Sequence, residues 1–323
     1  MISRRQLIAA AAASTFAGAR ARAADSFPDH EITFVVPWGA GGSNDILARE
    51  LQPLLREQGV NIVIENQVGA TGAIGLRRVA TSKPDGYTLG MGTSSTVAYM
   101  AQGKTPLRNS MFTSIARVST DPLLLLVPGE GPIADLDGFI AFAKAHPDKL
   151  SIGTPGTFNL NHIFAAMAAR AAGVGFTDVP FTGGAQVITA LAGKQIDAGV
   201  LKPSESIGQI RSKLVRPIGV FASERLALLP DVPTFKERGF DVFPYGPVVQ
   251  MAYVVGPAKL PEAVRSRLIG IFSKAIQDPR FKTFAQQNSF LVDDLTGDAL
   301  DKEVDAVTVA IATVAKQVFK EQG

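Results

Sequence analysis

Short apolar runs rich in β-branched residues alternate along this chain with segments whose apolar residues recur every three or four positions. The runs predict strands and the recurring spacing predicts helices, so the pattern is typical of an α/β fold with mostly parallel sheets. The predicted strands lie at 32–36, 60–65, 87–92, 122–127, 150–153, 177–180, 196–200, 215–221 and 248–255.

Four helices follow from the same pattern. They cover the regions 46–55, which contains Pro53 and is expected to bend there, 136–146, 187–193 and 300–319. The last has an acidic polar face, so it is expected to pack on the protein body and not on a membrane surface. The mature chain has room for two domains.

The succession of strand, glycine-rich turn and helix occurs once in each half of the chain, as two similar α/β domains facing each other would give. The apolar strands 122–127 and 248–255 are the best candidates for the segments that cross between the domains. These crossings predict one lobe from 24–124 together with 249–323, and a second from 125–248.

The first 23 residues read as an export signal. Ser3-Arg4-Arg5 begins a twin-arginine motif, an alanine-rich apolar stretch follows, and Ala21-Arg22-Ala23 offers a cleavage site. The apolar stretch is too short to span a bilayer. We therefore expect an exported protein of a Gram-negative periplasm that does not insert into the membrane after cleavage. A buried N-terminal helix is the alternative.

Removal of the signal changes the charge of the protein. The whole sequence has 32 basic and 29 acidic residues, but four arginines and no acid leave with residues 1–23. The mature chain then has a formal charge of −1, which gives no support to binding of nucleic acid. Because the chain has no cysteine, disulfides, thiolate metal sites and a lipid anchor on cysteine are excluded.

Candidate chemistry lies in two glycine turns. The strand at 32–36 stops at Pro37, turns through Gly39, Gly41 and Gly42, and opens a helix. Free backbone N–H groups at a helix start form a seat for an anion. A similar arrangement, with Thr154, Pro155, Gly156 and Thr157, follows the strand at 150–153. Two seats predict a protein that grips a small carboxylate from both sides, while ordinary strand-to-helix turns remain the alternative.

Several motifs resemble the receptors of tripartite tricarboxylate transporters, also called Bug-type solute-binding proteins. Five of them occur in this family's order and spacing across the mature chain. They are PWGAGGSNDILAR at 37–49, VIEN at 63–66, GATGAIG at 69–75, PDGYTL at 84–89 and LPDVPT at 229–234.

The resemblance implies a two-lobed periplasmic binding protein fold of a type II-like kind, each lobe a mostly parallel sheet flanked by helices. It implies a monomeric receptor without a cofactor or metal, which closes on a small di-, tri- or aromatic carboxylate and delivers it to the membrane subunits of the transporter. The ligand-binding residues carried over by position, with neighbours that would line the same cleft, are Trp38, Gly39, Ala40, Gly41, Gly42, Asn44, Asp45, Thr93, Ser94, Ser95, Thr154, Pro155, Gly156, Thr157, Phe158, His162, Phe181 and Lys202.

Two positions depart from the family pattern. Phe158 stands where the second loop usually has a glycine, and it would either restrict the approach of backbone to a ligand or supply an aromatic wall. Lys202, after Leu201, stands where an acidic or amide pair is common. It would either pair with a second carboxylate of the ligand or point to solvent. Both departures favour a dicarboxylate or an aromatic acid over an amino acid.

Catalytic motifs are not evident. Asn44 stands where a dinucleotide-binding turn needs its third glycine, and no phosphate loop, nucleophile elbow or His-Glu-x-x-His occurs. His30 and His146 are expected at the surface. His162 is expected to be a hydrogen-bonding residue of the cleft or helix start. The chain is therefore not expected to be an enzyme. A periplasmic sensor that signals to a membrane kinase would share the same fold and remains an alternative.

Overall fold

The computed structural model describes residues 27–146, 149–243, 248 and 250–320. The proposed signal at 1–23 lies outside these residues. Within them, no helix is long and apolar enough to cross a membrane.

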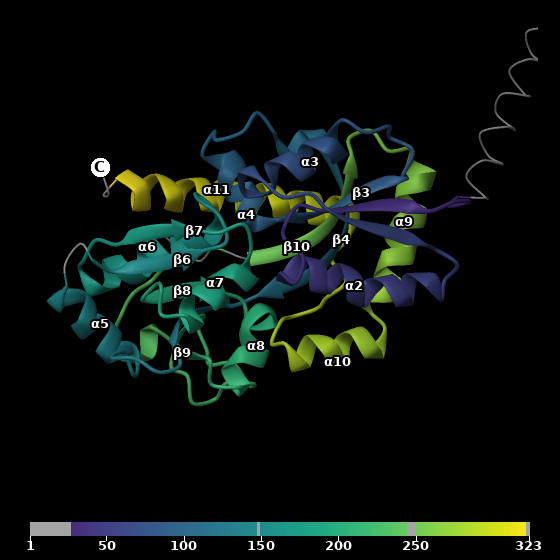
Figure 1. The fold of residues 1–323 in the computed structure, drawn as a ribbon. Coiled ribbons are helices and arrows are strands. Elements are labelled where there is room, and N and C mark those ends of the chain that lie inside the picture. Colours follow the sequence, from purple (N-terminus) through teal and green to yellow (C-terminus); the bar gives the residue numbers. More distant parts are fainter. Residues whose placement is uncertain (1–26, 147–148, 244–247, 249, 321–323) are drawn as a thin grey trace, which may run out of the picture.

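Two five-stranded mixed sheets lie side by side, each flanked by helices (Figure 1), and each defines one lobe. The first sheet has the order β2-β1-β3-β10-β4 and the second has the order β7-β6-β8-β5-β9. The first consists of β1 (Ile32–Val36), β2 (Ile62–Asn66), β3 (Thr88–Thr93), β4 (Phe112–Asp121) and β10 (Gln250–Pro257). The second consists of β5 (Leu123–Pro128), β6 (Ser151–Thr154), β7 (Thr177–Pro180), β8 (Ala198–Leu201) and β9 (Val215–Phe221). The predicted two-lobed α/β fold is thus confirmed.

One strand in each sheet runs against its two neighbours. β10 pairs antiparallel with β3 and β4, and β5 pairs antiparallel with β8 and β9. These are the two strands that the sequence marked as crossing segments. Since β4 in one sheet ends at Asp121 and β5 in the other begins at Leu123, the chain passes between the lobes there in two residues.

All nine predicted strands are present, within two residues at each end, but β4 was missed. Its sequence, FTSIARVSTD, mixes polar and apolar residues, so it lacks an apolar run. The polar groups of β4 are satisfied by the chain after α10. The N–H of Ser114 donates to Asp301, and Arg117 forms an ion pair with Asp293. Only tertiary contacts make this segment a buried strand.

Ten α-helices and three 3₁₀ helices complete the described part of the chain. They are α2 (Ser43–Arg56), η1 (Ala70–Gly72), α3 (Ala73–Ala80), α4 (Ser94–Ala101), η2 (Asn109–Met111), α5 (Leu136–Ala145), α6 (Leu160–Ala172), α7 (Gly184–Ala192), α8 (Pro203–Arg211), η3 (Lys236–Arg238), α9 (Glu262–Ile276), α10 (Pro279–Gln287) and α11 (Gly297–Lys320).

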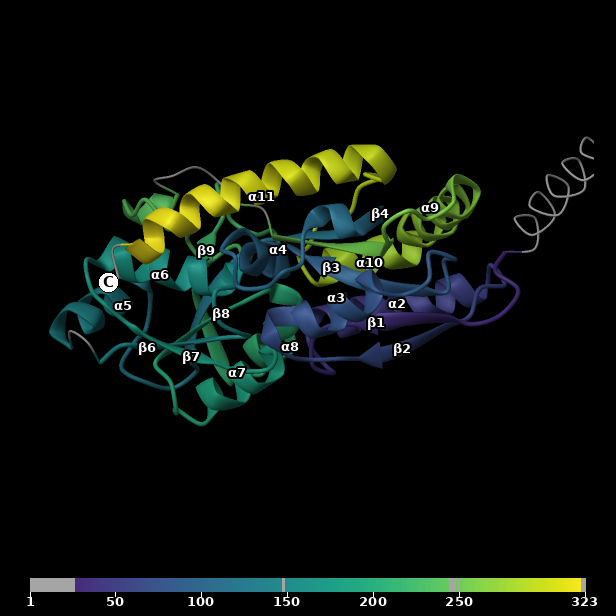
Figure 2. The ribbon, with the colours of Figure 1, turned by 90° about the horizontal axis from the view of Figure 1, so that it is seen from above.

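The C-terminal helix α11 lies across both lobes. Figure 2 shows it running from the region of β4 and α9 to the region of α6, and it contacts α4, β4 and α6. Its apolar face, which includes Leu300, Val304, Ile311 and Val318, is buried. The predicted amphipathic helix at 300–319 is present, and it packs on the second lobe as well as the first.

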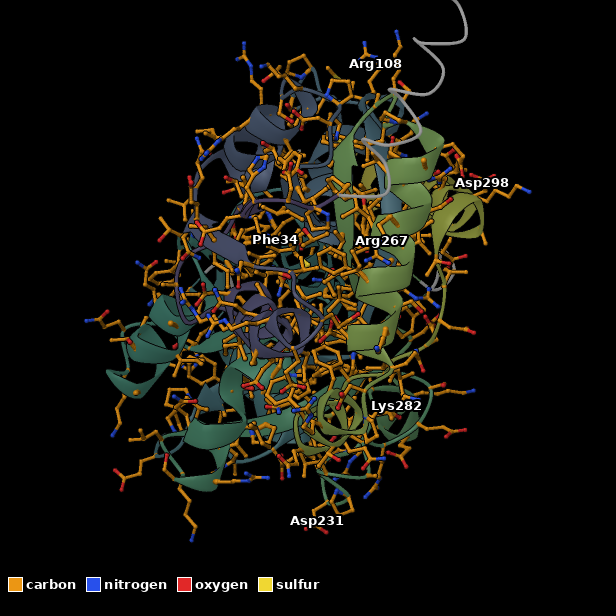
Figure 3. The ribbon with its side chains drawn as sticks, turned by 90° about the vertical axis from the view of Figure 1, so that its right-hand side faces the viewer. Phe34, Arg108, Asp231, Arg267, Lys282 and Asp298 are labelled. Carbon is orange, nitrogen blue, oxygen red and sulfur yellow. The ribbon has the colours of Figure 1, made fainter. Side chains whose placement is uncertain are left out.

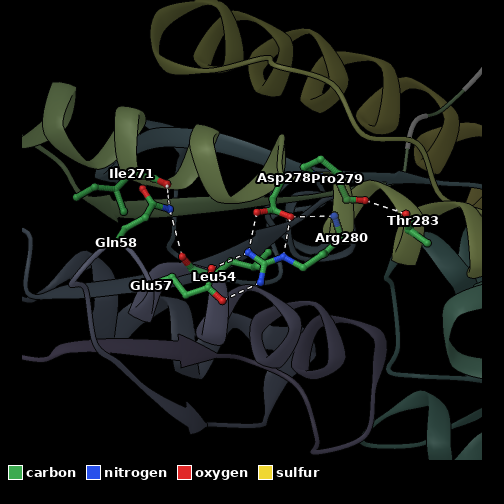
Figure 4. Close-up of polar contacts among 8 residues, drawn as sticks. All are labelled: Leu54, Glu57, Gln58, Ile271, Asp278, Pro279, Arg280 and Thr283. Atoms are coloured by element: carbon green, nitrogen blue, oxygen red, sulfur yellow. Dashed lines mark hydrogen bonds and ion pairs between the residues drawn. The ribbon is translucent and has the colours of Figure 1, made fainter.

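α10 is tied to the end of α2 by charged side chains. Arg280 donates hydrogen bonds to Glu57 beyond α2 and to Asp278 at the start of its own helix (Figure 4). Gln58 donates to the carbonyl of Ile271 beside them. Hydrogen bonds from the Arg280 guanidinium lower the pKa of the Glu57 and Asp278 carboxyl groups. Such exposed pairs contribute little stability individually, so they mainly fix where α10 lies.

Aromatic and aliphatic side chains fill the space between the first sheet and its helices. Phe34 of β1 and Phe272 of α9 are fully buried, with ring centroids 6.0 Å apart. Figure 3 shows Phe34 near the middle of the molecule and Asp231 at its lower edge. The apolar run of β1 thus forms the core directly beneath the first glycine turn.

Phe34→Ala should destabilise the protein by about 3–5 kcal/mol, because it removes a buried ring and leaves a cavity. Urea unfolding followed by circular dichroism measures the change. Lys282→Ala, at an exposed position, is the control and should shift the midpoint little. Equal midpoints for the two variants would contradict this account of the core.

Candidate functional site

Residues of both lobes line a small, partly open cavity of about 20 Å³. A cavity of this size holds about one water molecule. The first lobe contributes the start of α2 and the start of α4, the second contributes the starts of α6, α7 and α8, and Gln250 begins the crossing strand β10. The residues around the cavity are Trp38, Gly42, Ser43, Asn44, Thr93, Ser95, Pro155, Asn161, Gly183, Gly184, Lys202, Glu205 and Gln250.

Several polar atoms around this cavity are buried without a hydrogen-bond partner in the described part of the chain. They are Trp38 Nε1, Asn44 Oδ1 and Gln250 Oε1. The three side chains are at most 7% exposed. Because an unpaired buried polar atom is costly, three of them around one cavity indicate a place where a polar molecule completes the hydrogen bonding.

The first glycine turn forms the start of α2. Gly41 has φ +78°, which favours glycine, and its N–H donates to Asp45 Oδ2 at 2.9 Å. Asp45 also accepts from Arg49 and from Asn66, so this predicted site residue holds the turn and does not face the cavity. Three other predicted site residues, Trp38, Gly42 and Asn44, line the cavity.

The remaining members of the first predicted set lie nearby. Ala40 is exposed. Gly39 approaches the second lobe closely, since a Cβ there would lie 3.7 Å from the carbonyl oxygen of Thr182. The N–H of Ser43, the first residue of α2, points at the second lobe, where it donates to Glu205 Oε1 at 3.2 Å.

The hydroxyl groups of residues 93–95 form different hydrogen bonds. Thr93 is the N-cap of α4 and accepts from the N–H of Thr96. Ser94 accepts from the N–H of Met251 and so anchors β10. Ser95 donates to Asn161 of the second lobe at 3.3 Å. Thr93 and Ser95 line the cavity, while Ser94 lies behind it.

The second loop binds several of its own backbone N–H groups. Asn159 caps α6 by accepting from the N–H of His162, and the N–H of Phe158 donates to His162 Nδ1 at 3.1 Å. Thr154 donates to the carbonyl of Gly156. Across the lobes, Thr71 donates to the carbonyl of Thr157 at 2.8 Å. Of the six predicted residues in this loop, Pro155 lines the cavity.

Phe158 has a left-handed backbone conformation that favours glycine, with φ +56°. Its ring packs against Phe319 of α11, with centroids 5.4 Å apart, and Lys104 Nζ lies 4.0 Å from the ring centroid. The ring is therefore held on α11 and is not among the residues around the cavity. Phe181, also a predicted site residue, packs against the core of the second lobe.

His162 is buried, and burial lowers its pKa to about 4. Its Nδ1 accepts a backbone N–H, so the ring is neutral at pH 7 and braces the loop. The neighbouring Asp178 carboxyl lies 3.4 Å away, and burial raises its pKa to about 6. The prediction of a helix-start role for His162 agrees with these contacts. His30 and His146 are exposed, as expected.

Lys202 is 3% exposed, and its Nζ lies 3.1 Å from Asp121 Oδ2. The alternative that Lys202 points to solvent is therefore wrong. Its charge is matched inside the protein by Asp121, the last residue of β4. Asp121 is also 5% exposed, so this is a buried ion pair at the crossing between the lobes.

Sequence reasoning missed several residues around the cavity. Ser43, Asn161, Gly183, Gly184, Glu205 and Gln250 were not among the candidates. Some carried a usable signal, because Gly183-Gly184 opens α7 and Glu205 stands three residues after Lys202 at the start of α8. Gln250 carried none, since only the fold brings the start of β10 to the cavity.

A larger, half-open cavity of about 1200 Å³ lies beside the crossing strands, between the loop after β9 and the end of α10. Its lining is mostly apolar, with Phe221, Phe240 and Phe290, and Gln250 lines both cavities. Helix starts surround the smaller cavity and not this one, so the smaller cavity is the better candidate for a polar ligand. Within the described residues, no cluster of His, Asp or Glu could hold a metal ion.

Two lobes joined by crossing strands, with a polar cavity between them, define a solute-binding protein. Comparison with known proteins makes the assignment specific. The model of the tripartite tricarboxylate transporter family receptor matches residues 47–305, and the chain belongs to this family. This is a family of receptors and not of enzymes, as expected from the sequence.

Relatives support the assignment along most of the chain. A UPF0065 protein of Bordetella pertussis is 31% identical over 268 residues, which are 82% of each protein. The periplasmic binding protein BugD superposes with a TM-score of 0.85 at 26% identity, over 90% of this chain and 98% of that one. MatC from Rhodopseudomonas palustris with bound malate gives 0.82 at 29% identity, over 90% and 100%.

Asp45→Asn should destabilise the protein by about 1.5–3 kcal/mol at pH 7, because a buried carboxylate that accepts three hydrogen bonds is lost. Burial raises the pKa of Asp45, but these hydrogen bonds outweigh burial and leave the pKa below its usual 3.8. The contribution is thus present above pH 3.8 and is lost as the pH falls through the lower folded pKa.

Urea unfolding from pH 7 to pH 3 tests this, with Asp231→Asn at an exposed position as the control. The gap between wild type and Asp45→Asn should narrow at low pH. A gap that stays constant would contradict the ionised role of Asp45.

His162→Asn should flatten the acid dependence of stability. The folded pKa of about 4 lies below the unfolded value of 6.5, so the unfolded chain binds more protons between these values. The contribution of His162 is present above pH 6.5 and is lost as the pH falls to 4. An asparagine oxygen can still accept the N–H of Phe158.

Asp178 acts with the opposite sign, because its raised pKa makes stability fall as the pH rises from 3.8 to 6. Asp178 is present in both proteins, so its own titration contributes to both curves. Thermal unfolding at several pH values is the measurement, with exposed His146→Asn as the control. Parallel curves for wild type and His162→Asn would show that the role given to His162 is incorrect.

Proposed function

We propose that this protein is a periplasmic receptor that captures a small carboxylate between its lobes and delivers it to a membrane transporter of the tripartite tricarboxylate type. The observation that carries the proposal is the N–H of Ser43 at the start of α2, which points across the interlobe cavity. The unpartnered polar atoms around that cavity support it. The malate bound to MatC, a relative by structure at 29% identity, supports a carboxylate as the ligand.

Helix-start N–H groups suit this task because they bind an anion without a buried cation, whose desolvation is costly. Each hydrogen bond to a carboxylate contributes about 1.5–3 kcal/mol. A few such bonds reach micromolar affinity, about −8 kcal/mol, after the entropy lost on binding. The residues proposed to contact the ligand are those around the cavity. Those retained from the sequence prediction are Trp38, Gly42, Asn44, Thr93, Ser95, Pro155 and Lys202.

Capture requires the lobes to move relative to each other. We propose that residues 24–124 with 249–323 form one lobe and 125–248 the other. The hinge then lies at Pro122, between β4 and β5, and before β10. Sheet membership supports this division except at residues 123 and 124, which belong to β5 in the second sheet. The contacts of α11 with α6 make the C-terminal helix a further link across the hinge. Ligand then stabilises the closed form, which the transporter recognises.

The compartment follows from the proposed signal peptide. Cleavage after Ala23 would release a mature chain of the twin-arginine route into the periplasm. The receptor is proposed to act there as a monomer.

A thermal-shift screen of the mature protein tests the ligand class. The panel contains malate and other di- and tricarboxylates, monocarboxylates, aromatic acids, amino acids and neutral solutes. A ligand at 100 times its dissociation constant adds about 2.7 kcal/mol of stability, which raises the melting temperature measurably. A shift with carboxylates supports the proposal, while a shift with a neutral solute alone contradicts it.

Two substitutions at Ser43 test the seat itself. Proline is tolerated at the first position of a helix, and Gly42 before it is extended (φ −76°, ψ 163°), so Ser43→Pro should keep α2 while removing the N–H. Ser43→Ala keeps the N–H and removes the hydroxyl. Carboxylate affinity should fall at least tenfold in Ser43→Pro relative to Ser43→Ala. Equal affinities would exclude this N–H as the seat.

A further inference from the structure

One carboxylate of the protein already bridges the two lobes at the proposed seat. Glu205, in the first turn of α8, is partly buried, and its Oε1 accepts the N–H of Ser43 at the start of α2. Its Oε2 accepts the N–H of Lys202 at the start of α8, at 3.3 Å. A single side chain thus joins the N-terminal ends of two helices from different lobes. This is the contact that the proposed function assigns to a ligand carboxylate.

The glycine at position 184 leaves space for the carboxylate of Glu205. A Cβ on Gly184, at the start of α7, would lie 2.6 Å from the Glu205 carboxyl carbon and from Oε1. Any side chain at position 184 would therefore displace the carboxylate. Glycine at the start of α7 leaves room for it.

The charges nearby leave Glu205 without a full counter-charge. Lys202 lies close to Glu205, but its Nζ is paired with Asp121 at 3.1 Å. The cluster of Lys202, Asp121 and Glu205 has a net charge of −1 when all three are ionised. Burial raises the pKa of Glu205, although Lys202 and the two backbone N–H groups oppose this. A second carboxylate at the same seat would meet repulsion as well as competition for one N–H.

The size of the cavity also excludes a ligand while Glu205 contacts Ser43. The cavity beside Glu205 is about 20 Å³, enough for about one water and too small for a dicarboxylate. A ligand can occupy the seat only after Glu205 moves away from α2.

We propose that Glu205 is an internal substitute for the ligand carboxylate: it bridges the lobes when no ligand is bound, together with their other contacts, and it must leave the N–H of Ser43 before a ligand binds there. The first part concerns the protein alone. The second part rests on the proposed function. Glu205 therefore sets how tightly a carboxylate binds, because every ligand competes with it.

A local role in capping α8 is the competing explanation. Glu237 provides a control for it, since Glu237 accepts the N–H of Thr234 at 2.7 Å and pairs with Arg225, both in the same lobe, and it is exposed. Glu237→Gln therefore removes a capping carboxylate without touching the other lobe. Glu205→Gln removes the charge that faces Ser43, and Glu205→Ala removes the whole bridge.

Distances between the lobes test the first part without any ligand. The chain has no cysteine, so Glu50→Cys on α2 and Ala192→Cys on α7, both exposed, can carry spin labels at defined places. Pulsed electron paramagnetic resonance then gives the distance distribution. We expect one short distance in the wild type and in Glu237→Gln, and a shift to longer distances in Glu205→Gln and Glu205→Ala. The same distribution in all four proteins would overturn the proposal.

Calorimetric titration with malate and adipate tests the second part. Glu205→Gln should bind at least tenfold more tightly than wild type and Glu237→Gln, because the competitor has lost its charge. Unchanged or weaker binding in Glu205→Gln overturns competition. If neither acid binds to any of the proteins and the thermal-shift screen finds no carboxylate, the proposed function fails. The ligand-free distances still decide whether Glu205 closes the lobes.

Discussion

The backbone N–H groups at the start of α2, which have no carbonyl partner within the helix, form the constraint around which the two lobes are arranged. β1 is an apolar run buried in the core of the first lobe, so it delivers the helix start to the lobe surface at a fixed position. Gly41 donates inward to Asp45, whereas Ser43 donates outward to Glu205. The N–H of Gly41 thereby stabilises the turn itself, and the N–H of Ser43 contacts the opposite lobe. The helix dipole favours negative charge in both places.

The two predicted anion seats differ in how they are satisfied. At the second loop, Asn159 and His162 accept the N–H groups of His162 and Phe158 from within the same loop. The buried neutral ring of His162 and the ring of Phe158 on α11 fix this loop in place. The first seat is instead satisfied by a side chain from the other lobe. A contact between lobes can be exchanged when they separate, while a contact within a loop is lost only if the loop unfolds.

The crossing between the lobes contains a buried ion pair. Asp121 ends β4 immediately before the chain enters the second lobe, and Lys202 ends the loop after β8 there. Breaking such a pair leaves a buried charge and is strongly unfavourable. The ion pair therefore fixes the distance between the lobes near the hinge. Helix α11 contacts both lobes on the outside of the molecule. Movement of the lobes must leave these links intact or exchange them for water.

The sequence by itself determined nine of the ten strands described, the α/β class, the family and the two glycine turns, because apolar periodicity and glycine placement act locally along the chain. It also marked β5 and β10 as crossing strands from their continuous apolar character. Tertiary structure alone decided that β4 is a strand, since its polar groups are satisfied by Asp293 and Asp301 from far along the chain. It also decided that Lys202 is paired with Asp121 and that Glu205 reaches Ser43. Charge pairing depends on which residues the fold brings together, and no local pattern encodes that distance.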